Sequence, residues 1–249
     1  MEKIIVLCSK IIMFIVTTIV ALLFTSCKYD IDLGNGIDGN GKVKTENRTV
    51  SENFTKVSSN RGMEVIIEQA PTTEIQVEAD ENLLKHITTK VENGTLVVSS
   101  DENIDSAEKM VVRVKMPEIT GLESSSGSSI ATLAAIKGTS ISVKTSSGSE
   151  IKAVLEYDNV VSESTSGSSL TVSGKALKFT SSSSSGSTLD AGNLMANAVV
   201  AQATSGSSTE VHPLVLLNGT ASSGASIDYN GTPKTVTEEE SSGGSVSKN

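Results

Sequence analysis

The sequence predicts an all-β fold, a β-solenoid in which short coils stack along one axis. Three observations point to it: a Ser-Gly dipeptide that returns about every 19 residues, aliphatic residues in phase with that dipeptide, and many β-branched residues but few helix formers. A coil of this length has room for two or three short strands and tight corners. The chain of 249 residues is long enough for one large domain.

The Ser-Gly dipeptides divide the second half of the chain into repeats. Ser precedes each of seven regularly spaced glycines, and the residue three places after the glycine is aliphatic in six of the seven. We predict that these glycines adopt positive φ at the coil corners, because glycine does so without steric cost. The predicted corners are Gly127, Gly148, Gly167, Gly186, Gly206 and Gly224, with Gly243 in a degenerate seventh unit. Unstructured Ser/Gly-rich sequence would not keep aliphatic residues in phase.

The repeat region is predicted to span residues 121–249, after a strand-rich segment at residues 48–120. That segment contains five runs typical of strands: Phe54–Val57, Glu64–Glu68, Glu74–Glu78, Thr95–Ser99 and Met110–Lys115. It could form a separate β cap or the early coils of the same solenoid. At the other end, three consecutive acidic residues, Glu238–Glu240, replace apolar positions. We interpret them as protection of an exposed edge, the alternative being a contact with a cation or a partner.

The first 26 residues resemble a lipoprotein signal peptide. Two lysines precede a fourteen-residue, mainly apolar run at 11–24, which is too short for a membrane-spanning helix. Thr-Ser-Cys follows, so we expect cleavage before Cys27 and acylation of its thiol. The alternatives are an ordinary signal peptide and a retained membrane anchor. Residues 27–47, rich in Gly and Asn, are predicted to be a flexible tether.

This arrangement predicts an exported protein, lipid-anchored in the cell envelope at the surface or periplasmic face of the outer membrane. The amino-acid composition argues against several classes of binding partner. The net charge is −9, which argues against nucleic acid. The chain has no Trp and only 3% aromatic residues, which disfavours an aromatic platform for sugars or bases. Two His and two Cys leave little for a transition-metal site, and we expect neither metal nor cofactor.

One acidic column within the repeats allows an enzymatic interpretation. Asp190, Glu210 and Asp228 each stand four places after a corner glycine in consecutive coils. Stacked about 4.8 Å apart they would form an exposed acidic stripe, and two such carboxylates would suit a retaining glycosidase. The alternative is a solvated column beside the aliphatic one, which we favour because no His, Arg or aromatic residue joins it. We therefore predict no catalytic residues and no enzyme, with a polysaccharide-active enzyme as a lesser alternative.

The order of segments is similar to that of a known family. The runs GKVKTENRTVSENFTKVSS, RGMEVIIEQ, VEADENLLKHI and VENGTLVVSS, followed by the Ser-Gly repeats, resemble the putative auto-transporter adhesin, head GIN domain family over about residues 42–245. The resemblance implies a secreted or envelope lipoprotein and a right-handed parallel β-helix of single-stranded coils. No catalytic residue can be assigned to this chain from the resemblance. The expected function is adhesion or interaction with a glycan or protein, or alternatively a structural, accessory part of a periplasmic or outer-membrane complex.

Overall fold

A computed structural model describes residues 36–249 of the chain. The predicted signal peptide, Cys27 and the first part of the predicted tether lie outside these residues. The described part contains strands and turns and no helix. Within it, no helix has the length and apolar character needed to cross a membrane.

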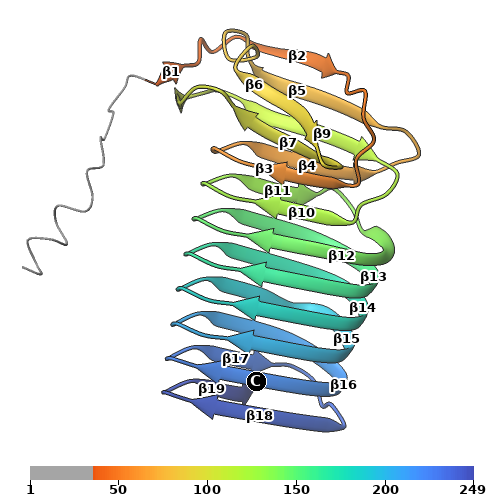
Figure 1. Ribbon diagram of the computed structural model, residues 1–249, viewed down its shortest axis with the longest axis vertical. Coiled ribbons are helices and arrows are strands. Elements are labelled where there is room, and N and C mark those ends of the chain that lie inside the picture. The colour runs from red at the N-terminus through yellow and green to blue at the C-terminus, as the bar shows by residue number, and fades with distance from the viewer. Residues whose placement is uncertain (1–35) are drawn as a thin grey trace, which may run out of the picture. The chain divides into compact units, whose positions relative to one another are not determined.

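The described part is a β-solenoid, as predicted, with stacked parallel coils about 19 residues apart (Figure 1). Its most regular coils are formed by four strands, β13 (Glu150–Ser164), β14 (Ser169–Ser183), β15 (Thr188–Ala203) and β16 (Ser208–Ser222). Each coil is one strand of 15 or 16 residues that curves from one face of the solenoid to the other. Each of these coils is thus single-stranded, as the family resemblance implies, although a coil of this length has room for two or three short strands.

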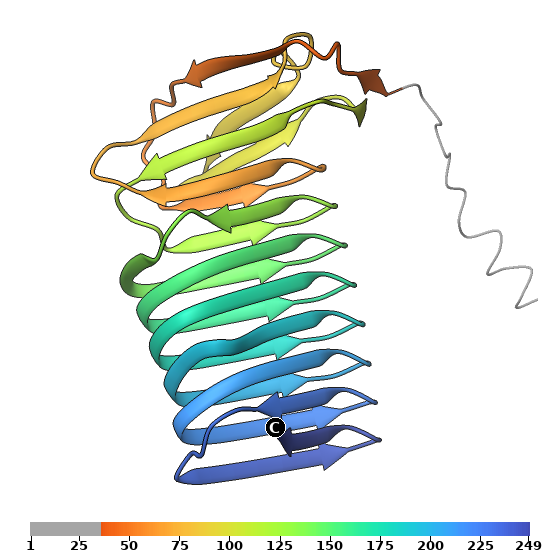
Figure 2. The ribbon, with the colours of Figure 1, turned by 180° about the vertical axis from the view of Figure 1, so that it is seen from behind.

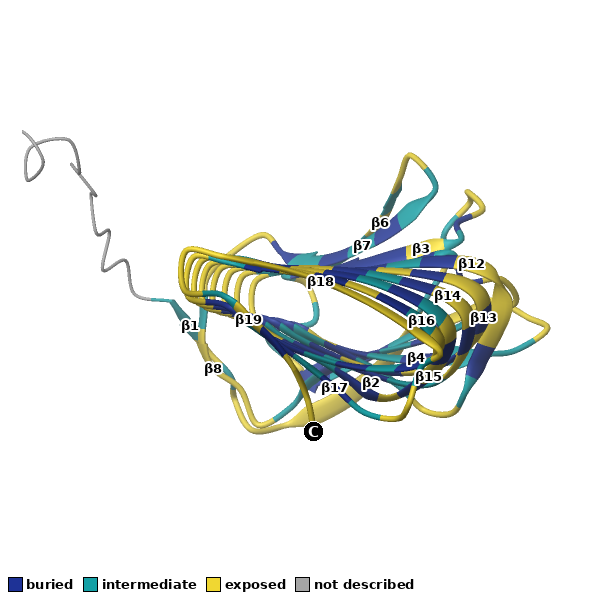
Figure 3. Cartoon of the chain, turned by 90° about the horizontal axis from the view of Figure 1, so that it is seen from below, coloured by how far each residue is buried: buried dark blue, intermediate teal, exposed yellow. Residues whose placement is uncertain are grey.

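Alternation of side chains builds the core of these coils. In β14, Leu170, Val172 and Phe179 are buried while Lys175 and Leu177 are exposed. Parallel pairing aligns the same column in successive coils, so that Ile151, Leu170 and Leu189 lie opposite one another. Figure 3 views the coils along the axis, with buried positions along both faces of the coil and exposed turns at one edge. Each coil therefore buries its apolar residues against its two neighbours.

The Ser-Gly corners form as predicted, and the serine shares the glycine's unusual conformation. At one corner Ser147 has φ 54° and Gly148 has φ 68°. Positive φ at both central residues is the geometry of a type I′ turn. The N–H of Gly148 donates to the carbonyl of Ser166 in the next coil at 3.1 Å. Glycines at positive φ occupy all the predicted corners: Gly127, Gly148, Gly167, Gly186, Gly206, Gly224 and Gly243.

A buried hydroxyl follows five of these corners and ties the coils together. Ser149 and Ser187, each one residue after a corner glycine, are about 2% exposed or less. The hydroxyl of Ser149 donates to the carbonyl of Ser124 at 2.6 Å, and that of Ser187 to the carbonyl of Ser164 at 2.7 Å. These bonds run between coils, so this serine column satisfies polar groups that the narrow interior would otherwise leave unpaired.

Residues 48–120 contain both a coil and a cap, so each of the two open alternatives describes part of the segment. The coil is formed by β3 (Lys56–Ser59) and β4 (Glu64–Gln69). It pairs in parallel with β10 (Gly121–Ser124) and β11 (Ser129–Thr132), the start of the repeat region, which continues into β12 (Ile136–Thr145). A further parallel tier, β7 (Thr95–Ser100) and β9 (Met110–Met116), lies on the other side of that coil.

Antiparallel strands complete the cap beyond this tier. They are β2 (Val43–Arg48), β5 (Glu74–Asp80) and β6 (Ile87–Glu92). On one face β5 pairs with β9 and β2 with β5, while on the other β6 pairs with β7. Figure 2 shows these orange and yellow strands at the end of the solenoid away from the C-terminus. The reversal of direction ends the parallel stacking at this end.

The predicted tether extends too far toward the C-terminus. Residues 37–38 form β1 and pair with β8 (Ile104–Ser106), and β2 begins at Val43. Glycine allows this packing, because a Cβ at Gly39 would lie 2.0 Å from Asp80 Oδ2. Asp80 is buried and accepts hydrogen bonds from the backbone N–H groups of Gly41 (2.9 Å), Lys109 (3.2 Å) and Glu108 (3.4 Å). This carboxylate fixes the chain where composition predicted flexibility.

The last coil is formed by short strands, β17 (Ser226–Tyr229), β18 (Thr235–Ser241) and β19 (Ser245–Lys248). β18 pairs with β16 and β19 with β17, and no described strand covers their other side. Glu238 lies opposite Gly219 and Glu240 opposite Ala221, both at core positions of the preceding coil. The two glutamates therefore occupy core columns of the solenoid at its uncovered end.

Candidate functional site: a groove on the N-terminal sheet

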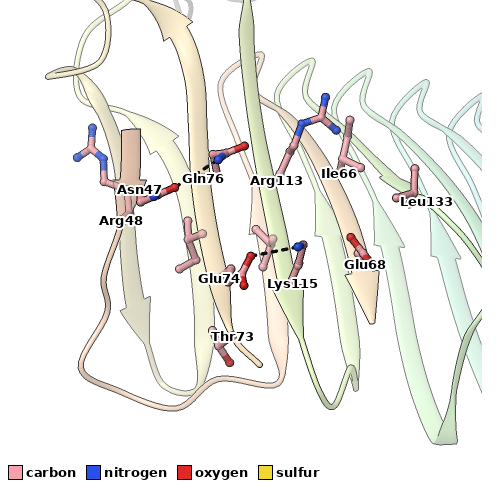
Figure 4. A pocket seen from close by; sticks show the side chains of 12 residues that line it. Asn47, Arg48, Ile66, Glu68, Thr73, Glu74, Gln76, Arg113, Lys115 and Leu133 are labelled. Atoms are coloured by element: carbon pink, nitrogen blue, oxygen red, sulfur yellow. Dashed lines mark hydrogen bonds and ion pairs between the residues drawn. The ribbon is translucent and has the colours of Figure 1, made fainter. Parts of the chain in front are cut away.

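A groove of about 520 Å³ lies on the outer face of the sheet formed by β2, β5, β9, β4 and β11 (Figure 4). Alternation along the strands decides which residues line it. On β9, Arg113 and Lys115 face outward between the buried Val112, Val114 and Met116. The groove therefore has side chains from several strands of one hydrogen-bonded sheet.

One row of outward residues crosses the groove from strand to strand. Asn47 lies opposite Gln76, Gln76 opposite Arg113, and Arg113 opposite Ile66. Gln76 donates from Nε2 to Asn47 Oδ1 at 3.3 Å. The row thus passes from two amides through a guanidinium to an aliphatic side chain.

A parallel row contains an ion pair. Lys115 Nζ lies 3.1 Å from Glu74 Oε2, and Lys115 also lies opposite Glu68 on β4. The hydrogen bond to Glu74 raises the pKa of Lys115, helped by the charges of Glu74 and Glu68. Lys115 therefore stays protonated and offsets the carboxylates on either side of it.

Arg113 contacts its neighbouring carboxylate much less closely than Lys115 contacts Glu74. Its nearest carboxylate is Glu78, with 3.9 Å between Nη2 and Oε2, too far for a hydrogen bond. The side chain is 43% exposed. By contrast, Arg48, at the rim, lies 3.2 Å from Glu46 and donates to the carbonyl of Leu84 at 2.7 Å. Arg113 therefore presents donors to the groove that no group among residues 36–249 accepts.

Aliphatic side chains form the end of the groove nearest the repeats. Ile66 on β4 is half-buried, and Leu133, just after β11, is 65% exposed. Both line the groove together with Arg113. An apolar surface thus adjoins the guanidinium.

The three predicted acidic residues lie on adjacent strands, in register: Asp190 opposite Glu210, and Glu210 opposite Asp228. All three are half-buried. Each already accepts a hydrogen bond, from Gly192 N at 3.1 Å, Asn230 Nδ2 at 2.8 Å and Ser247 Oγ at 2.7 Å, respectively. Among the described residues no group of three or more His, Cys, Asp or Glu could hold a metal ion. Any role for this column in binding stays a prediction.

Sequence reasoning missed the groove. The alternation in Met110–Lys115 was sufficient to place Arg113 and Lys115 on one face of a strand. No sequence pattern predicts the order β2, β5, β9, β4, in which neighbours in space are distant in the chain. That order alone brings Gln76 and Ile66 to either side of Arg113.

The fold is shared with several solved structures. A putative adhesin from Bacteroides fragilis superposes with a TM-score of 0.80 at 19% identity, covering 86% of this chain and all of that one. A putative adhesin from Parabacteroides merdae gives 0.70 at 19% identity, covering 86% and 98%. A putative lipid binding protein from Parabacteroides distasonis gives 0.69 at 18%, covering 86% and 99%. At such identities the likeness shows the fold alone.

No curated protein matches the chain. The family described as "Putative auto-transporter adhesin, head GIN domain" matches residues 53–233. That range takes in the first coil, the cap strands β5 to β9 and the repeats as far as β17. The chain therefore belongs to the putative auto-transporter adhesin, head GIN domain family.

Proposed function

We propose that the chain is a non-catalytic adhesin or interaction module of the cell envelope, held in the outer membrane by lipid on Cys27. It contacts a glycan or protein ligand through the groove around Arg113. The observation that carries the proposal is this groove, whose side chains come from a paired sheet while its central cation has no hydrogen-bonded partner among the described residues. A surface of this kind binds without prior rearrangement.

Two further facts support the proposal. The family and two of the similar structures carry the adhesin description, which fits an exported protein that makes contacts. The Thr-Ser-Cys sequence after a short apolar run supplies a signal for acylation at Cys27. Several acyl chains at about 0.8 kcal/mol per buried CH₂ would anchor the chain stably.

The test is adhesion of intact cells to immobilised glycans and extracellular proteins. We expect cells that make the chain to bind at least one class of ligand, and cells lacking it to bind none of that class. A Cys27→Ala variant is the control, since it leaves residues 36–249 unchanged but removes the acylated thiol, so the chain should no longer be held in the outer membrane and adhesion should be lost. Equal adhesion with and without the chain would contradict the proposal and favour an accessory role in an envelope complex.

A further inference from the structure

Arg113 stands between two kinds of surface on one cross-strand row. On one side are the amides of Gln76 and Asn47, joined by a single hydrogen bond of 3.3 Å. Within residues 36–249, Gln76 Oε1 and Asn47 Nδ2 hold no further hydrogen bond. On the other side are the aliphatic side chains of Ile66 and Leu133. Figure 4 shows these residues along the groove.

We infer that this row binds a saccharide that carries a carboxylate, such as a uronic or sialic acid residue. The planar guanidinium of Arg113 matches a carboxylate with two parallel hydrogen bonds. The amides of Gln76 and Asn47 each offer a donor or acceptor to sugar hydroxyls. Ile66 and Leu133 cover the C–H face of the ring. The inference deepens the proposed function and rests on it.

The unused donors of Arg113, rather than the net charge of the groove, suit an anionic group. Three cations, Arg48, Arg113 and Lys115, line the groove with two carboxylates, Glu68 and Glu74, and two further carboxylates, Glu46 and Glu78, lie 3.2 Å from Arg48 and 3.9 Å from Arg113. Lys115 offsets the carboxylates, which lie on either side of it on β5 and β4. Arg113 keeps N–H donors for the ligand, because Glu78, at 3.9 Å, is too far away to accept a hydrogen bond from it.

The floor of the groove favours a saccharide over an acidic peptide. Peptides commonly bind by adding a strand to a free sheet edge. The floor strands β5, β9 and β4 each pair with a strand on both sides, so their backbone N–H and C=O groups are used within the sheet. Recognition on these three strands depends on side chains alone, whereas β2, at the outer side of the groove, pairs with β5 only among the described strands. A ligand rich in hydroxyl groups fits that requirement better than an extended backbone.

Calorimetric titration of the full chain in detergent micelles tests the inference. The probes are a galacturonate tetramer, a hyaluronan tetramer and sialyl-lactose, each with its methyl ester, and a tetraglutamate peptide. We expect at least one acidic saccharide to bind and its ester to bind about tenfold more weakly or worse. Arg113→Gln should cause a similar loss. Arg113→Lys should recover only part, because an ammonium lacks the planar fork.

The matched control is Lys152→Gln. Lys152 lies on the same outward row, opposite Ala131 on β11, but outside the groove, and its exposed side chain pairs with Glu150 at 2.7 Å. We expect this variant to bind like the unchanged protein. Equal losses for Lys152→Gln and Arg113→Gln would mean general charge attraction and would overturn the inference.

Other outcomes separate this inference from the proposed function. Tighter binding of tetraglutamate than of every saccharide would replace the saccharide with a peptide. If none of the three acidic saccharides binds but cells still adhere through the chain, the inference fails and the proposed function stands. If no probe binds and adhesion does not depend on the chain, both fail.

Discussion

At the scale of single residues, the interior of the solenoid mixes well-bonded and unbonded hydroxyls. Ser162 and Ser181 lie opposite each other on β13 and β14, and each is 1% exposed. Their Oγ atoms have no hydrogen-bond partner among residues 36–249. The same column continues with Val143 on one side and Ala201 on the other, so apolar groups fit there. A buried hydroxyl without a partner costs free energy that an alanine would not.

We therefore predict that the double variant Ser162→Ala with Ser181→Ala is more stable than the unchanged protein. Its free energy of unfolding should be about 1–3 kcal/mol higher. Urea denaturation measures the difference. Ser164→Ala is the matched control, because Ser164 lies two residues further on and its hydroxyl lies 3.1 Å from that of Ser168. That control should be destabilised. Loss of stability in the double variant comparable with the control would contradict the prediction.

Asp80 gives a second residue-scale prediction, on pH. The backbone hydrogen bond from Gly41 is the largest influence and lowers the pKa of Asp80, while those from Glu108 and Lys109 add to the effect and desolvation opposes it. A lowered native pKa means that ionised Asp80 stabilises the fold fully above the ordinary Asp pKa. This stabilisation is lost as pH falls below that value and through the native pKa.

Asp80→Asn should lower the free energy of unfolding at pH 7, and the difference from the unchanged protein should shrink at about pH 3. Urea denaturation at both pH values measures it. Glu123→Gln, at an exposed site on β10, should differ little from the unchanged protein at either pH. A difference for Asp80→Asn that stays constant with pH would rule out this role of the carboxylate.

At the scale of elements, the uncovered C-terminal coil depends on two inward glutamates. Glu240 accepts a hydrogen bond from the N–H of Val246 on β19 at 2.7 Å, and Glu238 lies 3.4 Å from the hydroxyl of Tyr229. Charges at core columns of an edge strand oppose the addition of another strand. The column that holds Ile141, Val160 and Phe179 in earlier coils continues with Val236, so the remaining surface of the edge is partly apolar.

Replacing both charges, Glu238→Val with Glu240→Val, should allow the ends of two molecules to associate. Sedimentation velocity at neutral pH should show dimers or larger species. The control is Glu239→Val, because Glu239 lies between them, at an outward position. That control should stay like the unchanged protein. A double variant that sediments as the unchanged protein does would show that the glutamates do not protect the edge.

At the scale of the whole molecule, the solenoid was readable from the sequence because each coil repeats the same few requirements. A glycine at positive φ and an aliphatic residue three places later recur often enough to define the coil length. The cap was not readable in this way. Its strands β2, β5, β9 and β4 are neighbours in the sheet but do not follow one another along the chain. Short apolar runs in the sequence do not indicate with which other strand each will pair. For the same reason the role of Arg113 could not be predicted, because its neighbouring side chains depend on that strand order.

The ordering of residues 37–48 was missed for a local reason. Glycine and asparagine in this stretch predict flexibility. Close packing of Gly39 against the Asp80 carboxylate uses the same glycine for a different purpose. The acidic column at Asp190, Glu210 and Asp228 was visible because its members share one repeat position.

We propose that the anchored solenoid meets its ligand outside the cell. The most direct measurement is protease treatment of intact cells that carry an epitope after Asn249, beside the Cys27→Ala variant. We expect that intact cells lose the epitope, and that the Cys27→Ala variant no longer fractionates with the outer membrane. Protection of the epitope until the outer membrane is broken would contradict it, since the groove could then meet only partners inside the envelope.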